Sequence, residues 1–295
     1  MIGFLIWFAR RSDRAWISVP LLAALIHPAI PPSPLGAQPP AAFAKVGSIE
    51  HPPVREASGL VASRRYSGVF WTICDSGNLP HLFAIERTGK LLAEYALDKT
   101  ANVDWESLAM DDQGNLYIGD IGNNLRLPLR WVLKVREPDP REVVAAPDGP
   151  SAIKRLLVDK MFPFRFPGDA FDVEGTFFLR GSLYLVSKER KGTALYCLQL
   201  DKSSEPRTVT EVCRVPVMDT VTGADITADG RRVALCSYRE VVVFELGDGS
   251  VEALAGEPAQ RIPFLASGVE GCAWDGEDLV LVSEDRSLYR TSLAH

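Results

Sequence analysis

Short apolar runs alternate with clusters of turn residues along this chain, and residues 104–124 show the pattern most clearly. Two strand-like runs, 104–110 and 114–124, flank the segment Asp111-Asp112-Gln113-Gly114. Glycine tolerates positive φ and aspartate hydrogen-bonds to nearby backbone, so this segment predicts a tight turn between two strands. More side-chain oxygens gather at the outer ends of these strands than packing requires: Asp104, Glu106, Asp120, Asn123 and Asn124.

Segments of this kind, each interpreted as four short strands, can be superimposed five times after residue 40. The copies begin near Ser58, Asp104, Asp172, Thr222 and Val269. A period of about 40–50 residues is typical of the blades of a β-propeller. We therefore predict an all-β fold in which five four-stranded blades surround a central axis.

The last copy has only three predicted strands. The strand-like run Phe43–Ile49 belongs to no copy, and its pairing with the last blade would close the ring and remove its open edges. The outer strand of the second copy is expected within Ile153–Phe166, and that of the third within Thr208–Val217. Six blades are the alternative, if residues 138–168 contain more than one outer strand.

Residues 1–40 differ from the rest of the chain. Basic residues at 10–14 precede a mostly apolar run at 15–26, which is shorter than the roughly 20 residues of a membrane span. This order is typical of a secretory signal, with a plausible cleavage site at Leu35-Gly36-Ala37. We expect export to the periplasm or the extracellular space, with an uncleaved N-terminal anchor as the alternative. The propeller domain is expected at residues 41–295, after a Pro-rich linker.

Charge and cysteine content exclude some classes of partner and site. The net charge of -6 at pH 7 disfavours a nucleic-acid partner, because phosphate binding needs a basic surface. The five cysteines lack CxxC spacing, which disfavours structural zinc, and we expect them to be buried as small apolar residues. Cys197 and Cys213 flank a short connection and could pair if oxidised. We expect a monomer without a stable membrane span in the mature chain.

The first strand of each propeller blade lines the axis, so equivalent positions of the copies face one another. Aligned on the small residue that opens each first strand, the copies place Ser58, Glu106, Glu174, Thr222 and Glu270 at one level. Converging glutamates repel one another unless a cation lies among them or their pKa values rise. A hard divalent cation such as Ca2+ suits carboxylate ligands, so Glu106, Glu174 and Glu270 are the candidate metal ligands.

Two other roles stay open for these glutamates. They would hold the ring together if they bonded backbone amides of the neighbouring blade, or they would act as catalytic carboxylates. No catalytic residue is assigned from the sequence. Only four histidines are present, too few outside the leader and the terminus for a serine triad or a His-rich metal site. His81 could face the rim, but we expect a structural hydrogen-bonding role.

The segments Asp75-Ser76-Gly77-Asn78 and Asp120-Ile121-Gly122-Asn123 both read Asp-x-Gly-Asn and both follow a second strand. Turn chemistry alone is the simpler explanation, but their place beside the glutamates favours a shared ligand rim. The mixture of cations and carboxylates expected there would suit a polar ligand that carries phosphate or carboxylate. The candidate rim residues are Asp75, Asn78, Asp104, Asp120, Asn123, Asn124, Lys188, Tyr238 and Glu284.

The chain resembles bacterial exported β-propeller proteins that are similar to phytase-like esterases and to NHL-repeat or gluconolactonase-type propellers. The resemblance covers roughly residues 43–293 and rests on four stretches: Trp71–Asn78, Asp104–Glu106, Leu116–Asn124 and Asp172–Glu174. The related enzymes use an axial metal, often calcium, to hydrolyse phosphoesters or lactones. The resemblance therefore implies metal-facing roles for Glu106, Glu174 and Glu270. The chain departs from the pattern at Cys74, a position that is often polar, and at Ser58 and Thr222, which interrupt the acidic ring.

Two functions follow from the sequence. The first is an exported propeller that binds a polar small ligand, a divalent metal or both at its axial face. The alternative is a metal-dependent hydrolase of phosphoesters or lactones. Both expect Ca2+ or another divalent cation near the glutamates, and they differ in whether a bound ester or lactone is cleaved.

Overall fold

The computed structural model describes residues 43–142, 153–168, 171–189, 192–217 and 219–292. Every described residue belongs to one compact unit within Pro39–His295. The leader expected at residues 1–40 lies outside the described residues. Within the described ranges, none of the helices has the length and apolarity that a membrane span needs.

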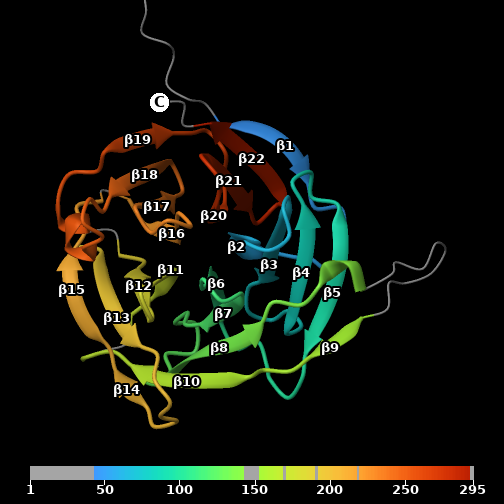
Figure 1. Ribbon diagram of the computed structural model, residues 1–295, viewed down its shortest axis with the longest axis horizontal. Coiled ribbons are helices and arrows are strands. Elements are labelled where there is room, and N and C mark those ends of the chain that lie inside the picture. The colour runs from blue at the N-terminus through green and yellow to red at the C-terminus, as the bar shows by residue number, and fades with distance from the viewer. Residues whose placement is uncertain (1–42, 143–152, 169–170, 190–191, 218, 293–295) are drawn as a thin grey trace, which may run out of the picture. The chain divides into compact units, whose positions relative to one another are not determined.

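Five antiparallel four-stranded blades surround a central axis, as the repeats predicted (Figure 1). Each blade runs from an inner strand at the axis to an outer strand at the rim. The first blade is β2 (Ala57–Ala62), β3 (Val69–Cys74), β4 (His81–Glu86) and β5 (Leu91–Leu97). The second is β6 (Trp105–Met110), β7 (Asn115–Asp120), β8 (Arg130–Arg136) and β10 (Lys160–Arg165).

The remaining blades follow in chain order. The third is β11 (Val173–Leu179), β12 (Ser182–Ser187), β13 (Ala194–Gln199) and β15 (Thr210–Arg214). The fourth is β16 (Val221–Ile226), β17 (Arg232–Ser237), β18 (Glu240–Glu245) and β19 (Gln260–Pro263). The fifth is β20 (Val269–Asp275), β21 (Asp278–Ser283), β22 (Ser287–Ser292) and β1 (Ala44–Ser48). Two short 3-10 helices complete the described elements: η1 (Pro140–Glu142) and η2 (Val251–Ala255).

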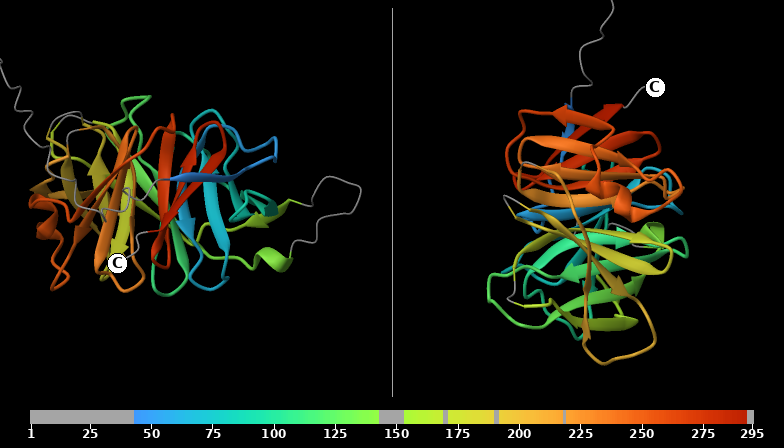
Figure 2. Two further views of the ribbon diagram at one scale, coloured as in Figure 1. Left: turned by 90° about the horizontal axis from the view of Figure 1, so that it is seen from above. Right: turned by 90° about the vertical axis from the view of Figure 1, so that its left-hand side faces the viewer.

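The N-terminal strand closes the ring. β1 pairs antiparallel with β22, with Ala44 opposite Arg290 and Ser48 opposite Ser287. The two strands come from opposite ends of the described chain and lie side by side, blue against red (Figures 1 and 2). Gly47 also approaches the backbone of Thr88 so closely that a Cβ would lie 2.0 Å from its carbonyl oxygen. The predicted closure by the run Phe43–Ile49 is confirmed.

Two short strands each add a fifth strand to the preceding blade, although the strands before and after them in sequence belong to the next blade. β9 (Lys154–Leu156) pairs parallel with β5 of the first blade, and β14 (Arg207–Thr208) pairs parallel with β10 of the second. The prediction of one outer strand within Ile153–Phe166 is therefore wrong in part. The chain first forms β9, which covers the outer edge of the first blade and protects it from further pairing. It then forms β10, the outer strand of the second blade. The number of blades stays at five, not six.

The core lies between blades. Every residue of β3, β6 and β7 is buried, because both faces of each blade pack against a neighbouring blade. Trp71, Leu108 and Leu133 belong to the cluster between the first two blades. All five cysteines are free. Cys197 lies opposite Thr210 and Cys213 opposite Leu195, so the two thiols suggested as a pair are offset along neighbouring strands.

Candidate functional site

A β-bulge interrupts the inner strand of every blade near the N-terminal end of that strand. In the second blade the register passes from Trp105 opposite Asp120 to Ser107 opposite Gly119, which leaves Glu106 without an opposing residue. A bulge of this kind bends the strand and re-aims the side chain of the extra residue. The extra residues of the next three inner strands are Glu174, Thr222 and Glu270.

The first blade shifts its bulge by one residue. Its register passes from Ser58 opposite Ile73 to Leu60 opposite Thr72, so Gly59 is the extra residue, at a φ of 74°. Cys74 consequently lies opposite Ala57, as Asp120 lies opposite Trp105. The predicted equivalence of Asp75 and Asp120 is therefore wrong by one position, since Asp75 follows the end of β3.

The predicted axial level exists, but its members divide into two kinds. Ser58 donates to the backbone oxygen of Glu106 at 3.2 Å, and Thr222 donates to that of Val269 at 2.6 Å. These hydroxyl groups connect neighbouring blades. By contrast, no described backbone amide donates to the side-chain carboxylate of Glu106, Glu174 or Glu270. The glutamates thus do not make the inter-blade amide contacts considered as an alternative role.

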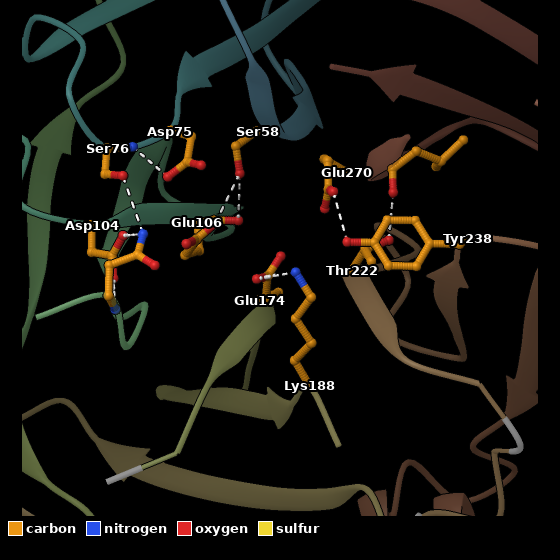
Figure 3. A network of polar contacts seen from close by, with 12 residues as sticks. Ser58, Asp75, Ser76, Asp104, Glu106, Glu174, Lys188, Thr222, Tyr238 and Glu270 are labelled. Carbon is orange, nitrogen blue, oxygen red and sulfur yellow. Dashed lines mark hydrogen bonds and ion pairs between the residues drawn. The ribbon is translucent and has the colours of Figure 1, made fainter. Parts of the chain in front are cut away.

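Five carboxylates form two overlapping groups. Figure 3 shows Asp75, Asp104, Glu106 and Glu174 of these groups around the axis. Oxygens of Asp75, Asp104 and Glu106 lie within 4.8 Å of one another, and so do oxygens of Glu106, Asp172 and Glu174. Glu106 belongs to both groups. Asp172 is not among the site residues predicted from the sequence, although Asp172-Val173-Glu174 repeats the spacing of Asp104-Trp105-Glu106. The repeated Asp-x-Glu spacing was the signal that could have identified it.

The loop after β7 fixes the position of Asp104. The backbone N–H of Asn124 donates to Asp104 Oδ2 at 2.7 Å, and its side-chain amide donates to Oδ1 at 2.6 Å. Asp120 Oδ1 accepts the backbone N–H of Asp104 at 2.7 Å. Asn123 Oδ1 accepts from Arg130 at 2.6 Å. Of these predicted rim residues, Asn124 and Asp120 thus support Asp104, whereas Asn123 binds Arg130.

Gly122 makes room for the carboxylates. A Cβ at this position would lie 2.4 Å from Asp104 Oδ2 and 2.6 Å from Glu106 Oε1. Any side chain there would displace both groups, which gives the glycine of the Asp-Ile-Gly-Asn stretch a role beyond turn formation. Carboxylate oxygens of Asp104 and Glu106 therefore fill the space beside Gly122.

The supports around Asp75 have a different origin. Asn102 donates to the backbone oxygen of Asp75 at 2.7 Å and accepts the backbone N–H of Trp105 at 3.1 Å, which ties the first blade to the second. Asn102 was not predicted as a site residue, since a lone loop asparagine belongs to no recognisable sequence pattern. Asn78 donates to the backbone oxygen of Asp75 at 3.1 Å and so stabilises the turn.

A cation and a phenol occupy the other side of the axis. Lys188 Nζ lies 2.5 Å from Glu174 Oε1 and 5.6 Å from the ring centre of Tyr238. The hydroxyl of Tyr238 donates to Glu270 Oε1 at 3.0 Å, while Glu270 Oε2 is buried and has no partner among the described residues. Of the three predicted metal ligands, Glu106 and Glu174 thus lie together, and Glu270 lies outside both carboxylate groups. Glu284 is exposed on the turn after β21.

Burial and mutual repulsion dominate the electrostatics of the carboxylates. Burial, followed by the charges of Glu174, Asp75 and Asp104, raises the pKa of Glu106 well above its usual range. Burial also raises the pKa values of Asp75, Asp172 and Glu174. Because the 2.5 Å contact with Lys188 fits an ion pair, we take Glu174 as ionised and Glu106 as the proton carrier of the cation-free site.

His81 has the structural role that was expected of it. Its Nδ1 lies 2.6 Å from Glu94 Oε1, and His51 Nε2 lies 2.9 Å from the other oxygen of the same buried carboxylate. Glu94 is on β5, toward the outer side of the first blade. His81 therefore does not belong to the axial rim.

Two buried aspartates predict how stability depends on pH. Burial raises the pKa of Asp120 and of Asp225 from 3.8 to about 6. The folded state thus holds protons that the unfolded state releases, so their stabilising effect is complete below pH 4 and is lost as pH rises through about 6. Each rise corresponds to on the order of 3 kcal/mol. In chelator, the free energy of unfolding should therefore fall between pH 4 and pH 8.

Replacement of Asp225 by asparagine tests this slope. Asn can still accept the Trp274 backbone N–H that Asp225 Oδ2 accepts at 2.8 Å. Asp225→Asn should flatten the pH dependence of urea unfolding, while Asp159→Asn, at an exposed site, should leave it unchanged. Equal slopes in all three proteins would contradict the assignment.

Comparisons with known proteins show similarity of fold. No family model matches the sequence, and no curated protein matches it either. Virginiamycin B lyase from Staphylococcus aureus, selenomethionine-substituted, is 14% identical over 84% of this chain and 69% of its own, with a TM-score of 0.42. A catalytically inactive variant of that lyase with quinupristin is 11% identical over 86% of this chain and 99% of its own, with a TM-score of 0.44.

A third similar structure is the nidogen/laminin complex, at 11% identity over 83% of this chain and 85% of that one, with a TM-score of 0.46. These neighbours are β-propeller proteins. At such identities and scores, the likeness extends to general architecture and says nothing about what the axial carboxylates do. The assignment of five blades rests on the sheet topology of this chain.

Proposed function

We propose that this protein is an exported propeller that binds a divalent cation and a polar, anionic small ligand at its axial face. One observation carries the proposal: two groups of three carboxylates share Glu106, and the oxygens of each group lie within 4.8 Å of one another. Oxygen ligands of this kind suit Ca2+ or Mg2+. Glu106 and Asp104 would hold the cation together with Asp75, and Glu106 and Glu174 would hold one together with Asp172.

The chemistry of the donor set fits a hard cation. Glu106 is 6% exposed, and among the described residues its carboxylate accepts one weak hydrogen bond, from Ser58 Oγ at 3.4 Å. Glu270, 7% exposed, adds a buried oxygen without a partner on the opposite side of the axis. Buried, unpartnered carboxylate oxygens are costly, and a bound cation would offset that cost.

Lys188 and Tyr238 give the site an anion-binding side. An anionic group placed on the axis would lie between the cation and the Lys188 ammonium, with the Tyr238 hydroxyl within the same ring of side chains (Figure 3). A phosphate or carboxylate group can bind a cation and an ammonium at once through charge-assisted contacts, whereas a neutral sugar offers neither of them a charged partner. This arrangement favours phosphorylated or carboxylated ligands.

The second candidate function is metal-dependent hydrolysis of phosphoesters or lactones. The sharing of Glu106 by two carboxylate groups favours it, because two-metal hydrolases place neighbouring cations around bridging ligands. Burial raises the pKa of Glu270, which suits a carboxyl group that exchanges protons near neutral pH. Export of the chain through its first 40 residues is part of both proposals, and N-terminal sequencing of protein secreted from cells would test it.

Calorimetry of the chelator-treated protein tests the binding function. We expect Ca2+ to bind first, and inorganic phosphate to bind only to the Ca2+-loaded protein. Lys188→Gln should weaken phosphate binding about tenfold, the effect of losing one charge-assisted hydrogen bond, without weakening Ca2+ binding. Phosphate binding of equal strength with and without Ca2+ would contradict the proposal. Turnover of phosphate monoesters or lactones that stops in chelator would favour the hydrolase instead.

A further inference from the structure

A cavity that is separate from the axial site lies at the outer side of the first blade. Its volume is about 490 Å³, within the range of small-molecule pockets. The walls come from β3, β5, the loop before β3 and η1. η1 contacts β5, although it follows the third strand of the second blade (Figure 1). The cavity is thus built where a segment of the second blade crosses over the first.

Two hydrogen bonds, one buried and one partly buried, hold this crossing segment in place. Trp71 Nε1 donates to Glu137 Oε1 at 2.8 Å, and Tyr95 donates to the backbone oxygen of Asp139, also at 2.8 Å. Trp71 and Tyr95 both belong to the core of the first blade. The wall that contains Pro140 and Arg141 is therefore held against the sheet of the first blade. The cavity is thus present before any ligand binds.

The cavity combines an apolar floor with a cationic rim. Val69, Leu92 and Pro140 line it together with the ring of Tyr66. Arg65, Lys90 and Arg141 also line it, and no acidic residue does. The guanidinium groups of Arg65 and Arg141 each lie 5.2 Å from the centre of the Tyr66 ring. Three cations in one concavity are unusual on a chain with a net charge of -6.

Neighbouring acids neutralise these cations unequally. Asp139 binds Arg141 in a bidentate manner, at 2.8 and 2.6 Å. Lys90 approaches Glu86 only at 3.7 Å, with both side chains well exposed, which contributes little. Arg65 makes no ion pair within the described part of the chain. Arg65 and Lys90 consequently remain available for an anion.

We propose that this cavity binds a small amphipathic anion, with its apolar body on Val69, Leu92 and Pro140 and its carboxylate or similar group at Arg65 and Lys90. A free inorganic anion would leave the apolar floor unfilled, and a neutral amphiphile would leave the cations unpaired. The site is independent of the proposed axial function, because the two sites share no residue.

Titration calorimetry with three probes tests the proposal: octanoate, octyl glucoside and inorganic phosphate. The protein should bind octanoate more tightly than either the neutral amphiphile or phosphate. Arg65→Gln should weaken octanoate binding about tenfold, the usual effect of losing a charged hydrogen-bond donor. Lys90→Gln should weaken it in the same direction. Both side chains are exposed, so neither change should disturb folding.

Two control variants make the test specific. Arg155→Gln removes an exposed arginine of β9 that pairs with Asp98 outside the cavity, and it should leave octanoate binding unchanged. Glu106→Gln should also leave it unchanged, which separates this site from the axial one. The proposal is overturned if octanoate does not bind, if octyl glucoside or phosphate binds as tightly, or if Arg155→Gln and Arg65→Gln have equal effects.

Discussion

Replacement of Glu106 by glutamine should lower the affinity of the protein for Ca2+ by more than about a hundredfold, because the number of charged ligands largely sets the affinity of such sites. Glu106 is the residue that both carboxylate groups share, so its loss affects each of them. Substitution of a single peripheral aspartate, such as Asp75, should cost less. Calorimetric titration of Ca2+ into chelator-treated protein measures the difference.

The same substitution should leave the fold intact. Glutamine has nearly the same shape and cannot ionise, so it resembles the protonated form in which burial and the neighbouring carboxylates hold Glu106 in the cation-free protein. The thermal midpoint in chelator should therefore stay the same or rise. Glu257→Gln, at an exposed position, serves as the matched control and should change neither property. Unfolding by Glu106→Gln, together with an absence of cation binding in the parent protein, would show that the glutamate is structural.

Removal of the closing strand should have the largest effect on stability. A chain that begins at Glu50 lacks β1, leaves the outer edge of β22 unpaired and loses the contact between Phe43 and Phe264. An open edge also invites pairing with other chains. We expect its thermal midpoint to lie roughly 10 °C or more below that of a chain that begins at Pro39, at about 2–4 °C per kcal/mol for a domain of this size.

Differential scanning calorimetry of the two chains measures this effect. Addition of a peptide that covers residues 39–49 should restore part of the lost stability to the shorter chain, because the peptide can supply the missing strand. Equal midpoints for the two chains would contradict the closure of the ring by β1. A lower thermal midpoint that the peptide does not raise would point to an effect of truncation other than the missing strand.

The blade pattern was predictable because local signals repeat. The runs expected at 104–110 and 114–124 contain β6 and β7, and the outer strand expected within Thr208–Val217 is β15. Closure by the N-terminal run followed from the missing strand of the last blade. The pairings of β9 and β14 were not predictable, since each is a short parallel contact with the preceding blade. Turn residues and hydrophobic periodicity describe a segment locally, so neither predicts a parallel pairing with a distant strand.

The candidate site was predictable where residues act through their position on the inner strands. Glu106 and Glu174 are extra residues of β-bulges, and repeat alignment found both. Glu270 also occupies a bulge, but Tyr238 binds its carboxyl group away from the two carboxylate groups. Asp75 was aligned one position off because the first bulge falls at Gly59. Alignment of repeats does not show such a shift, since a bulge changes register without a sequence signal of its own.

Anomalous diffraction from crystals soaked in Mn2+ tests the central claim most directly. Manganese prefers the same oxygen ligands as Ca2+ and Mg2+, and its anomalous signal locates it without ambiguity. We predict a peak within coordination distance of a Glu106 carboxylate oxygen and of at least one of Asp104 and Glu174. Crystals that show no peak at the axis, with Glu106 hydrogen-bonded to backbone amides instead, would contradict the account.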